Sequence, residues 1–326
     1  MTLEIPERLL LLATGQKLFY NRFMKKISEA LIILFILISI GGASYVIYEQ
    51  ISRILWYKNA VLGMYSNYQT LQKQYDDYKQ QTKNQKLVTI LAQNPDSNVN
   101  QIADIVANYA QKIEGAISIY YKNLTTNESI VVDRDQKYYM ASLYKIILAL
   151  YLLDKVDSGQ LTLEEKVGTT SATLELALEK IISVSNNEYA ITLADQYGWI
   201  NIENAMKRKL GIEFSFSKDL AISIKDVGAL FEDIALSINI PKSDSEYILG
   251  LLGNQELRLK LPKYLPSNIY SHNKTGEWKD YSHDAGIFYT PKANYILVFM
   301  SKTQNPLQTN EQMALMSKDI YESLNP

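Results

Sequence analysis

The sequence predicts an α/β (α+β) domain in which both ends form a five-stranded antiparallel sheet around an inserted helical lobe. Strand patterns lie at both ends of the last two thirds of the chain, and helical patterns lie between them. A long uncharged run precedes this region and predicts a transmembrane helix, followed by a helical stalk. The chain therefore divides into four segments: residues 1–29, 30–48, 49–94 and 95–326.

Charge and composition exclude several classes of protein. The 326 residues include 33 basic and 35 acidic side chains, so we expect no nucleic-acid partner bound through a basic surface. The sequence has no cysteine, which excludes disulfides, thiolate metal sites and cysteine nucleophiles. Its 2 histidines, His272 and His283, are too few for a three-histidine metal site, and no cluster of carboxylates accompanies them. We therefore expect no metal and no cofactor.

Residues 30–48 form the uncharged run that we interpret as a membrane-spanning helix. At about 1.5 Å per residue the run is about 28 Å long, close to the thickness of a bilayer core. Basic residues ahead of it predict a single-pass cell-membrane protein with a cytoplasmic N-terminus and an extracytoplasmic domain; they are Lys17, Arg22, Lys25 and Lys26. A cleaved signal peptide fits less well, because the charged lead and the apolar run are both long. A buried globular helix is rarely uncharged over this length.

Residues 49–94 are predicted to form the stalk, with helix to about residue 92. Apolar or aromatic side chains recur at spacings of three, four and seven, while Lys58 and Gln72 interrupt the seam. A stalk that forms a homodimeric coiled coil and a stalk that is a single solvated helix both remain open. A helix of this length would hold the following domain about 60 Å from the membrane. The polar stretch at residues 93–98 marks the boundary.

The domain at residues 95–326 has a helix and strands at each of its two ends. A helix at 100–112 precedes two strands joined by a turn, and three strands followed by a helix close the chain. Helical patterns fill residues 142–260, and a cleft between the sheet and these helices is the natural place for a site. The predicted strands are 116–121, 129–133, 269–277, 285–289 and 295–301, and the last helix is 310–324.

Ser142 and Lys145 form the first motif with chemistry, because residues three apart share a face of a helix. A serine hydroxyl needs a base to become a nucleophile, and a lysine can be that base if burial lowers its pKa. The apolar run after Lys145 predicts a buried helix, which would supply this condition. The alternative is an N-capping serine beside a lysine whose stem is covered and whose ammonium is solvated.

Two further motifs follow along the chain. Ser185 and Asn187 could offer a hydroxyl proton relay and an amide donor on a loop, or simply cap the helix that follows. Lys274, Thr275 and Gly276 could offer a positive charge, a hydroxyl and a close backbone approach on an edge strand, or simply form a turn. Each of these motifs is weak when it stands alone.

Together the three motifs resemble the Ser-x-x-Lys, Ser-x-Asn and Lys-Thr-Gly signature of class A β-lactamases and penicillin-binding proteins. The flanking stretches NNEYAITLADQYG and HDAGIFYTPKANYILVFMSK are also similar to this family. The resemblance covers roughly residues 113–323, which is nearly the whole predicted domain. It implies the β-lactamase/transpeptidase-like fold and a serine acyl-hydrolase.

The resemblance implies a role for each motif residue. Ser142 would be the nucleophile that opens a β-lactam or a D-alanyl peptide bond, and Lys145 would be its base. Ser185 would relay a proton to the leaving nitrogen with help from Lys274. Substrate would be held by Asn187, by Lys274 and Thr275 at its carboxylate, and along the strand by Gly276 and Glu277. The backbone N–H groups of Ser142 and Glu277 would form the oxyanion hole.

Several departures from the family pattern carry expectations of their own. Asn186 replaces the family's usual aspartate, which we expect to be tolerated, and the interval between Ser142 and Ser185 is shorter than in the family. Class A enzymes carry a Glu-x-x-x-Asn pattern whose glutamate activates the deacylating water. None of Glu188, Glu203, Glu213 and Asp219 starts such a pattern, and Glu213 is the best-placed substitute. We therefore expect acylation with slow deacylation.

A further departure concerns arginine. The family usually has an arginine on the strands near Lys-Thr-Gly, but none occurs after Arg258. We expect Lys279 or His283 to compensate, or carboxylate binding to be weaker.

Two other functions stay open beside the acyl-hydrolase. One is a catalytically weak cell-surface scaffold that is oligomerised by its stalk and binds peptidoglycan without turnover. The other is an esterase or amidase that uses the same residues. The retained Ser142, Lys145, Ser185 and Lys274 argue against a decayed site. The expected partners are thus a β-lactam or cell-wall peptide and, through residues 30–48, the lipid bilayer.

Overall fold

The computed structural model describes residues 22, 24–33, 88–91 and 97–326 of the chain. Two compact units are distinguished, Met1–Gln80 and Gln81–Pro326. In the first unit, residue 22 and residues 24–33 are helical. Among the described residues, no helix is both long and apolar enough to cross a bilayer. Most of the predicted membrane span 30–48 and of the stalk 49–94 lies outside the described residues.

The second unit is built on one antiparallel sheet with the order β1-β3-β2-β9-β8-β7 in the part of the chain that the structure describes. Strands β2 (Ala116–Asn123) and β3 (Ser129–Val132) come from the start of the unit. Strands β7 (Tyr270–Trp278), β8 (Tyr281–Tyr289) and β9 (Asn294–Lys302) come from its end. Antiparallel pairing of β2 with β9 joins the two ends, as the sequence predicted. Strand β7 stands at one edge, with one side of its backbone unpaired.

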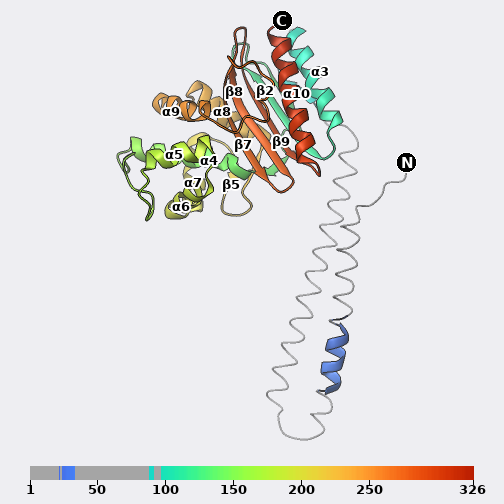
Figure 1. The fold of residues 1–326 in the computed structure, drawn as a ribbon, viewed down its shortest axis with the longest axis vertical. Coiled ribbons are helices and arrows are strands. Elements are labelled where there is room, and N and C mark those ends of the chain that lie inside the picture. Colours follow the sequence, from blue (N-terminus) through green and yellow to red (C-terminus); the bar gives the residue numbers. More distant parts are fainter. Residues whose placement is uncertain (1–21, 23, 34–87, 92–96) are drawn as a thin grey trace, which may run out of the picture. The chain divides into compact units, whose positions relative to one another are not determined.

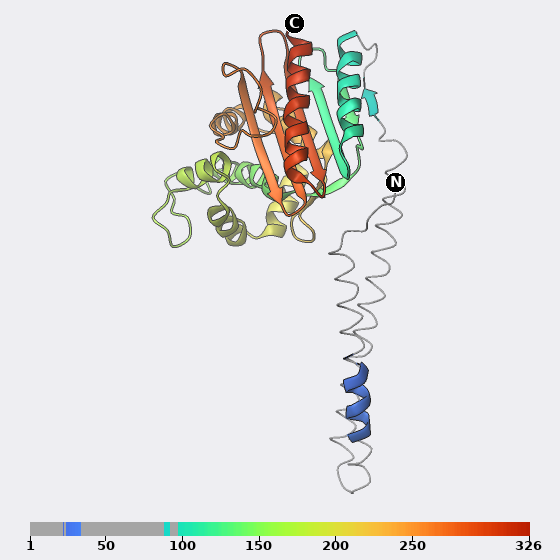
Figure 2. The same ribbon diagram turned by 45° about the vertical axis from the view of Figure 1, so that its right-hand side comes forward.

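Two helices cover one face of this sheet. Helix α3 (Ser97–Lys112) and helix α10 (Pro306–Leu324) lie side by side against it (Figures 1 and 2). Alternate residues of a strand face opposite sides, so Ile117, Ile119 and Tyr121 of β2 join this apolar layer. Other fully buried members include Val106, Phe288, Leu297, Phe299, Met313 and Ile320.

The remaining helices form a lobe away from α3 and α10 (Figure 1). Helix α8 (Ile224–Leu236) packs on β2 and β9, and α9 (Lys242–Gly253) packs on β7. Helix α4 (Tyr144–Asp157) contacts α5, α6, α7 and α9 and is buried from Tyr144 to Leu153. The other bounds are Leu174–Ser183 for α5, Asn187–Tyr197 for α6 and Trp199–Leu210 for α7.

The five predicted strands are confirmed, but the sheet has a further member. Strand β1 (Val88–Leu91) pairs with β3 at the edge opposite β7. These four residues were predicted as the end of the stalk helix, and that prediction is wrong for them. The sheet therefore reaches ahead of the predicted boundary at residue 95. A four-residue apolar strand has no periodicity of its own, and its partner lies about forty residues further along the chain.

A second, smaller sheet with the order β4-β6-β5 was not predicted. It consists of β4 (Lys137–Tyr139), β5 (Phe214–Ser215) and β6 (Ala221–Ser223). Two of these strands fall inside the region that was predicted to be helical. Their pairing places Lys137–Tyr139, the segment just ahead of Ser142, beside the chain that follows α7.

Candidate active site

Ser142 lies in a short 3₁₀ turn, Ala141–Leu143, that runs directly into α4. The preceding residue, Ala141, has a φ of +47°, a left-handed backbone conformation that costs a non-glycine residue about 1–2 kcal/mol. The surrounding packing must hold this conformation, because the local sequence does not favour it. Such strain is typical of residues that a fold fixes for function.

Strand β7 holds that turn from the other side. A Cβ atom added to Gly276 would come within 3.0 Å of O of Met140 and 3.3 Å of Cβ of Ala141. The sequence predicted a close backbone approach at this glycine, and the structure shows that the approaching chain is the segment of Ser142. The Lys-Thr-Gly strand and the serine turn are therefore in direct contact.

The loop before α6 supplies the third part of the site. Ser185 has a φ of +60°, and the side chain of Asn186 caps α6 by accepting a hydrogen bond from N of Tyr189 (2.9 Å). Asn186 thus has a structural role, which an amide oxygen fulfils as well as a carboxylate oxygen. Asn187 begins the helix beside it.

Lys145 points from the first turn of α4 into this loop. Its Nζ donates to O of Ser185 (2.5 Å), to Oδ1 of Asn187 (2.6 Å) and to Oγ of Ser185 (3.2 Å). The residue is fully buried. Burial lowers the pKa of Lys145 to about 8, because the ammonium loses its water and these three bonds go to neutral oxygens.

Lys274 reaches the same hydroxyl from β7. Its Nζ donates to Oγ of Ser185 (2.8 Å) and to O of Thr275 (3.1 Å). Burial, followed by the charge of Lys145, lowers the pKa of Lys274 to about 7. A hydroxyl has two lone pairs and one hydrogen, so the two lysines leave the Ser185 hydrogen free to be donated. Both lysines can exchange protons near neutral pH.

The structure therefore brings Lys145, Ser185, Asn187 and Lys274 together through hydrogen bonds, although no segment of sequence joins them. Ser142 is half-buried in the turn that leads into the helix of Lys145. Among the described residues, no hydrogen bond joins Oγ of Ser142 to Nζ of Lys145, whose donors are all directed at the Ser185 loop. Such catalytic bonds are often long before substrate binds.

Thr275 and Glu277 face the opposite side of β7 from Lys274 and Gly276, because side chains alternate along a strand. Thr275 is buried, whereas Glu277 is exposed. Oε1 of Glu277 lies 2.9 Å from Nζ of Lys260. Lys260 comes from the loop between α9 and β7 and also donates to O of His283 (3.0 Å). Sequence reasoning missed Lys260, because a lone lysine in a loop carries no signal of burial.

Asp284 joins Lys260 and Glu277 in a second group of charged side chains. It is fully buried and accepts hydrogen bonds from Nδ2 of Asn273 (3.0 Å) and from N of Leu261 (3.0 Å). Burial raises the pKa of Asp284 to about 6, against the charge of Lys260 and these two bonds, which lower it. The second bond fastens the loop that carries Lys260 to strand β8.

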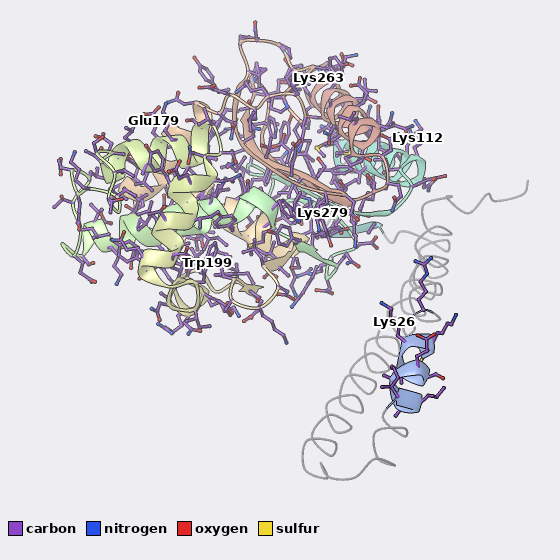
Figure 3. The ribbon with its side chains drawn as sticks, turned by 60° about the horizontal axis from the view of Figure 1, so that its bottom comes forward. Lys26, Lys112, Glu179, Trp199, Lys263 and Lys279 are labelled. Carbon is purple, nitrogen blue, oxygen red and sulfur yellow. The ribbon has the colours of Figure 1, made fainter. Side chains whose placement is uncertain are left out.

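The two residues that were expected to compensate for the missing arginine have different surroundings. His283 is fully buried, its Nδ1 accepts from N of Ser301 (3.1 Å), and its Nε2 therefore carries the hydrogen toward O of Tyr139 (2.8 Å). Burial lowers the pKa of His283 to about 4, so the ring is neutral at pH 7. Lys279 lies at the turn between β7 and β8 (Figure 3). Its Nζ lies 5.7 Å from the centre of the Trp278 ring. Lys260 is a buried cation that contacts Glu277 of strand β7 and O of His283 of strand β8.

The acidic residues between Asn187 and Ser223 are held elsewhere. Glu203 accepts from N of Phe216 (2.8 Å) and from N and Oγ of Ser217 (3.0 and 2.9 Å), which outweigh burial and lower the pKa of Glu203 to about 2. The side chain of Glu213 is 76% exposed and pairs with Lys207. The prediction that Glu213 could replace the family's glutamate has no support in this placement. Asp195 accepts from Nε1 of Trp199 (2.7 Å), and Glu188 and Asp219 are exposed.

Aromatic side chains stand beside Lys145 instead. The ring of Tyr144 lies 5.3 Å from that of Trp199 and 6.0 Å from that of Phe216, and Trp199 lies 5.9 Å from Phe216. Trp199 lies at the start of α7 in the helical lobe (Figure 3). This aromatic cluster adjoins Lys145 through Tyr144, whose ring centre lies 6.0 Å from Nζ of Lys145. Among the described residues, no group of three or more histidines, aspartates or glutamates is placed to hold a metal ion.

Comparisons with known proteins agree with this arrangement. The profile of the Beta-lactamase enzyme family matches residues 98–324. No curated protein matches the chain. A PBP-A mutant in an acyl-enzyme complex with penicillin G has a TM-score of 0.62 at 20% identity, over 69% of this chain and 96% of that one.

Two β-lactamases show the same degree of similarity. A β-lactamase from Chitinophaga pinensis has a TM-score of 0.62 at 18% identity, over 71% of this chain and 100% of that one. The extended-spectrum β-lactamase TLA-1 has a TM-score of 0.63 at 17% identity, over 71% and 100% of the two chains. At these identities the similarity is one of fold.

Proposed function

Because the chain belongs to the β-lactamase enzyme family, we propose that it opens β-lactams or D-alanyl amide bonds through an acyl-enzyme on Ser142 and deacylates slowly. The observation that carries the proposal is the convergence of two buried lysines on the hydroxyl of Ser185. Lysines with pKa values lowered to about 8 and about 7 can accept and return protons near neutral pH.

In the acylation step, neutral Lys145 accepts the hydroxyl proton of Ser142 while Oγ forms a bond to the carbonyl carbon of the substrate. The carbon–nitrogen bond then breaks, and the leaving nitrogen takes a proton from Oγ of Ser185. The hydrogen bonds from Lys145 and Lys274 to that oxygen allow one of the lysines to replace the proton. The backbone N–H groups of Ser142 and Glu277 would stabilise the oxyanion, as the family resemblance implies.

Slow deacylation is supported by the placement of the acidic residues between Asn187 and Ser223. Hydrolysis of an acyl-enzyme needs a base that activates water, and the family uses a glutamate for this. Here the acidic side chains of the corresponding interval are exposed or bound to Phe216, Ser217, Trp199 and Lys207. An acyl group on Ser142 should therefore persist. A PBP-A mutant of the same fold forms an acyl-enzyme complex with penicillin G.

The proposed site would act outside the cell. The uncharged run 30–48 and the basic residues ahead of it support a single-pass anchor with a cytoplasmic N-terminus. We place the domain on the extracytoplasmic side, where cell-wall peptides and β-lactams are encountered.

A binding scaffold without turnover is the less favoured function. Two buried lysines that donate their hydrogen bonds to neutral oxygens destabilise the folded state. Proteins retain such destabilising groups where activity needs them, and a scaffold has no such need.

Intact-mass spectrometry of the full-length chain in detergent micelles tests the proposal. We expect one penicillin G adduct per chain, located at Ser142 by peptide mapping, that survives for minutes while nitrocefin is turned over slowly. Ser142→Ala should not be labelled, whereas Ser158→Ala, an exposed serine at the end of α4, should be labelled as wild type. An adduct on Ser142→Ala would disprove the nucleophile, and fast nitrocefin turnover would disprove slow deacylation.

A further inference from the structure

Glu277, directly after the Lys-Thr-Gly motif, forms an ion pair with the buried side chain of Lys260. Its Oε1 lies 2.9 Å from Nζ of Lys260, and the two side chains are 65% and 4% exposed. Lys260 is also fixed by its bond to O of His283 (3.0 Å). The ion pair therefore combines an immobile cation with an anion that can rotate into water.

This ion pair lies beside the edge where a substrate would bind. Strand β7 has one unpaired side, so a ligand that follows it passes Thr275 and then Glu277. Besides burial and the charge of Lys145, the charge of Lys260 lowers the pKa of Lys274 and the charge of Glu277 raises it. The pair is thus within electrostatic reach of the lysine that binds Ser185.

A charged ligand and a neutral ligand meet this pair differently. Burial lowers the pKa of Lys260, while Glu277 and Asp284 oppose that shift, so the cation needs an anion nearby. An incoming carboxylate can become that anion only if Glu277 leaves, and otherwise the two carboxylates repel each other. A neutral ligand leaves the pair intact.

We propose that Glu277 is a specificity-determining residue that lowers the acylation rate of donors with a free carboxylate relative to uncharged donors. Specificity is a difference between two affinities, and a like charge beside the bound ligand supplies the repulsive part of that difference. This inference rests on the proposed function, because it concerns acylation of Ser142. The backbone N–H of Glu277 has a separate role and is unchanged by a substitution of the side chain.

The experiment compares penicillin G with its methyl ester, which carries the same acyl group without the carboxylate. Second-order rate constants for adduct formation on Ser142 are measured with the full-length chain by intact-mass spectrometry. The readout is the rate constant for the acid divided by the rate constant for the ester. We expect Glu277→Gln to raise this ratio about fivefold, the upper range for a partly exposed ion pair. The matched control Glu322→Gln removes an exposed carboxylate paired with Lys318 on α10 and should leave the ratio unchanged.

Salt separates an electrostatic role from a structural one. The exposed charge of Glu277 is screened at high ionic strength, so the gain in Glu277→Gln should shrink between about 0.05 and 0.5 M salt. A merely structural role would change the rates of both donors equally and leave their ratio independent of salt.

Each outcome decides the matter. An unchanged or lowered ratio in Glu277→Gln overturns the role of Glu277 while the Ser142 adduct upholds the proposed function. Lys260→Gln should lower the ratio below that of wild type, and if this buried variant does not fold, the Glu277→Gln ratio still decides. If neither donor labels wild-type Ser142, the proposed function fails and this inference fails with it.

Discussion

Buried lysines lie on both faces of strand β7, and their hydrogen-bond and ion-pair partners differ between the two faces. Toward the helical lobe, Lys274 and its neighbour Lys145 donate their hydrogen bonds to hydroxyl, amide and carbonyl oxygens. Toward the other face, Lys260 is paired with the carboxylate of Glu277, and Asp284 lies nearby. Hydrogen bonding to neutral oxygens suits proton transfer, because burial then lowers a lysine pKa with little opposition. Pairing with carboxylates suits the recognition of charge. The following predictions test that division of roles.

The largest expected effect is on the catalytic face. Lys145→Met should lower the rate constant of acylation by penicillin G about 10²–10⁴-fold, the range for loss of a general base. Its melting temperature at pH 7 should not fall, because no carboxylate loses a partner. Stopped-flow labelling and thermal denaturation measure the two quantities.

Lys260→Met is the matched variant on the other face. It removes the cation whose charge most lowers the pKa of buried Asp284, so unfolding should become easier by about 3–5 kcal/mol. A variant pair in which Lys145→Met is the less stable protein would contradict the comparison. Chemical denaturation of both variants decides the order.

Gly276→Ala tests the contact between the strand and the serine turn. The added Cβ would lie 3.0 Å from O of Met140, so the strand or the turn must move by a few tenths of an ångström. We expect acylation to slow about tenfold, since catalysis is sensitive to such displacements. Gly250→Ala is the control, because a Cβ there meets nothing within 4 Å in helix α9 and should be neutral or slightly stabilising. Equal rates in both variants would rule out the proposed contact.

The pH dependence tests which form of Lys145 is active. Below pH 8 the ammonium is protonated and cannot accept the Ser142 proton, so acylation by the uncharged methyl ester should rise with pH and level off above about 8. The two buried lysines resist being charged together, since the charge of Lys145 adds to burial in lowering the pKa of Lys274. A rate that is constant from pH 6 to 9 would exclude Lys145 as the base.

The smallest effect is expected at the cap of α6. Asn186→Asp should leave acylation and the melting temperature nearly unchanged, because either side chain accepts from N of Tyr189. Asn186→Ala removes the cap and should cost about 1 kcal/mol of stability. A large loss of labelling in Asn186→Asp would mean that the absence of charge at this position matters for the site.

Much of the fold could be read from local patterns. Strands β2, β8 and β9 contain apolar runs that could be recognised, β3 was indicated by the turn that joins it to β2, and the run after Lys145 correctly indicated a buried helix. Strands β1, β4, β5 and β6 have two to four residues, which is too short for a period to be seen. The partners of β1 and β4 are distant in the sequence, so only the assembled sheets specify these pairings.

The site divides in the same way. The order of Ser142, Lys145, Ser185, Asn187 and Lys274 indicated which side chains would meet, and four of them do so through hydrogen bonds. Lys260 was missed, and Glu213 was favoured although its side chain is exposed and paired with Lys207. A motif indicates neither the burial of a loop lysine nor the exposure of a glutamate.

The sequence by itself determined the chemical groups, their order and the alternation that sends Lys274 and Glu277 to opposite faces of one strand. The tertiary structure decided which lysines meet neutral oxygens and which one meets a carboxylate. It also decided that the acidic residues between Asn187 and Ser223 are exposed or bound to other residues. The physical reason is that burial and hydrogen-bond partners set a pKa, and both arise from contacts between segments far apart in the chain.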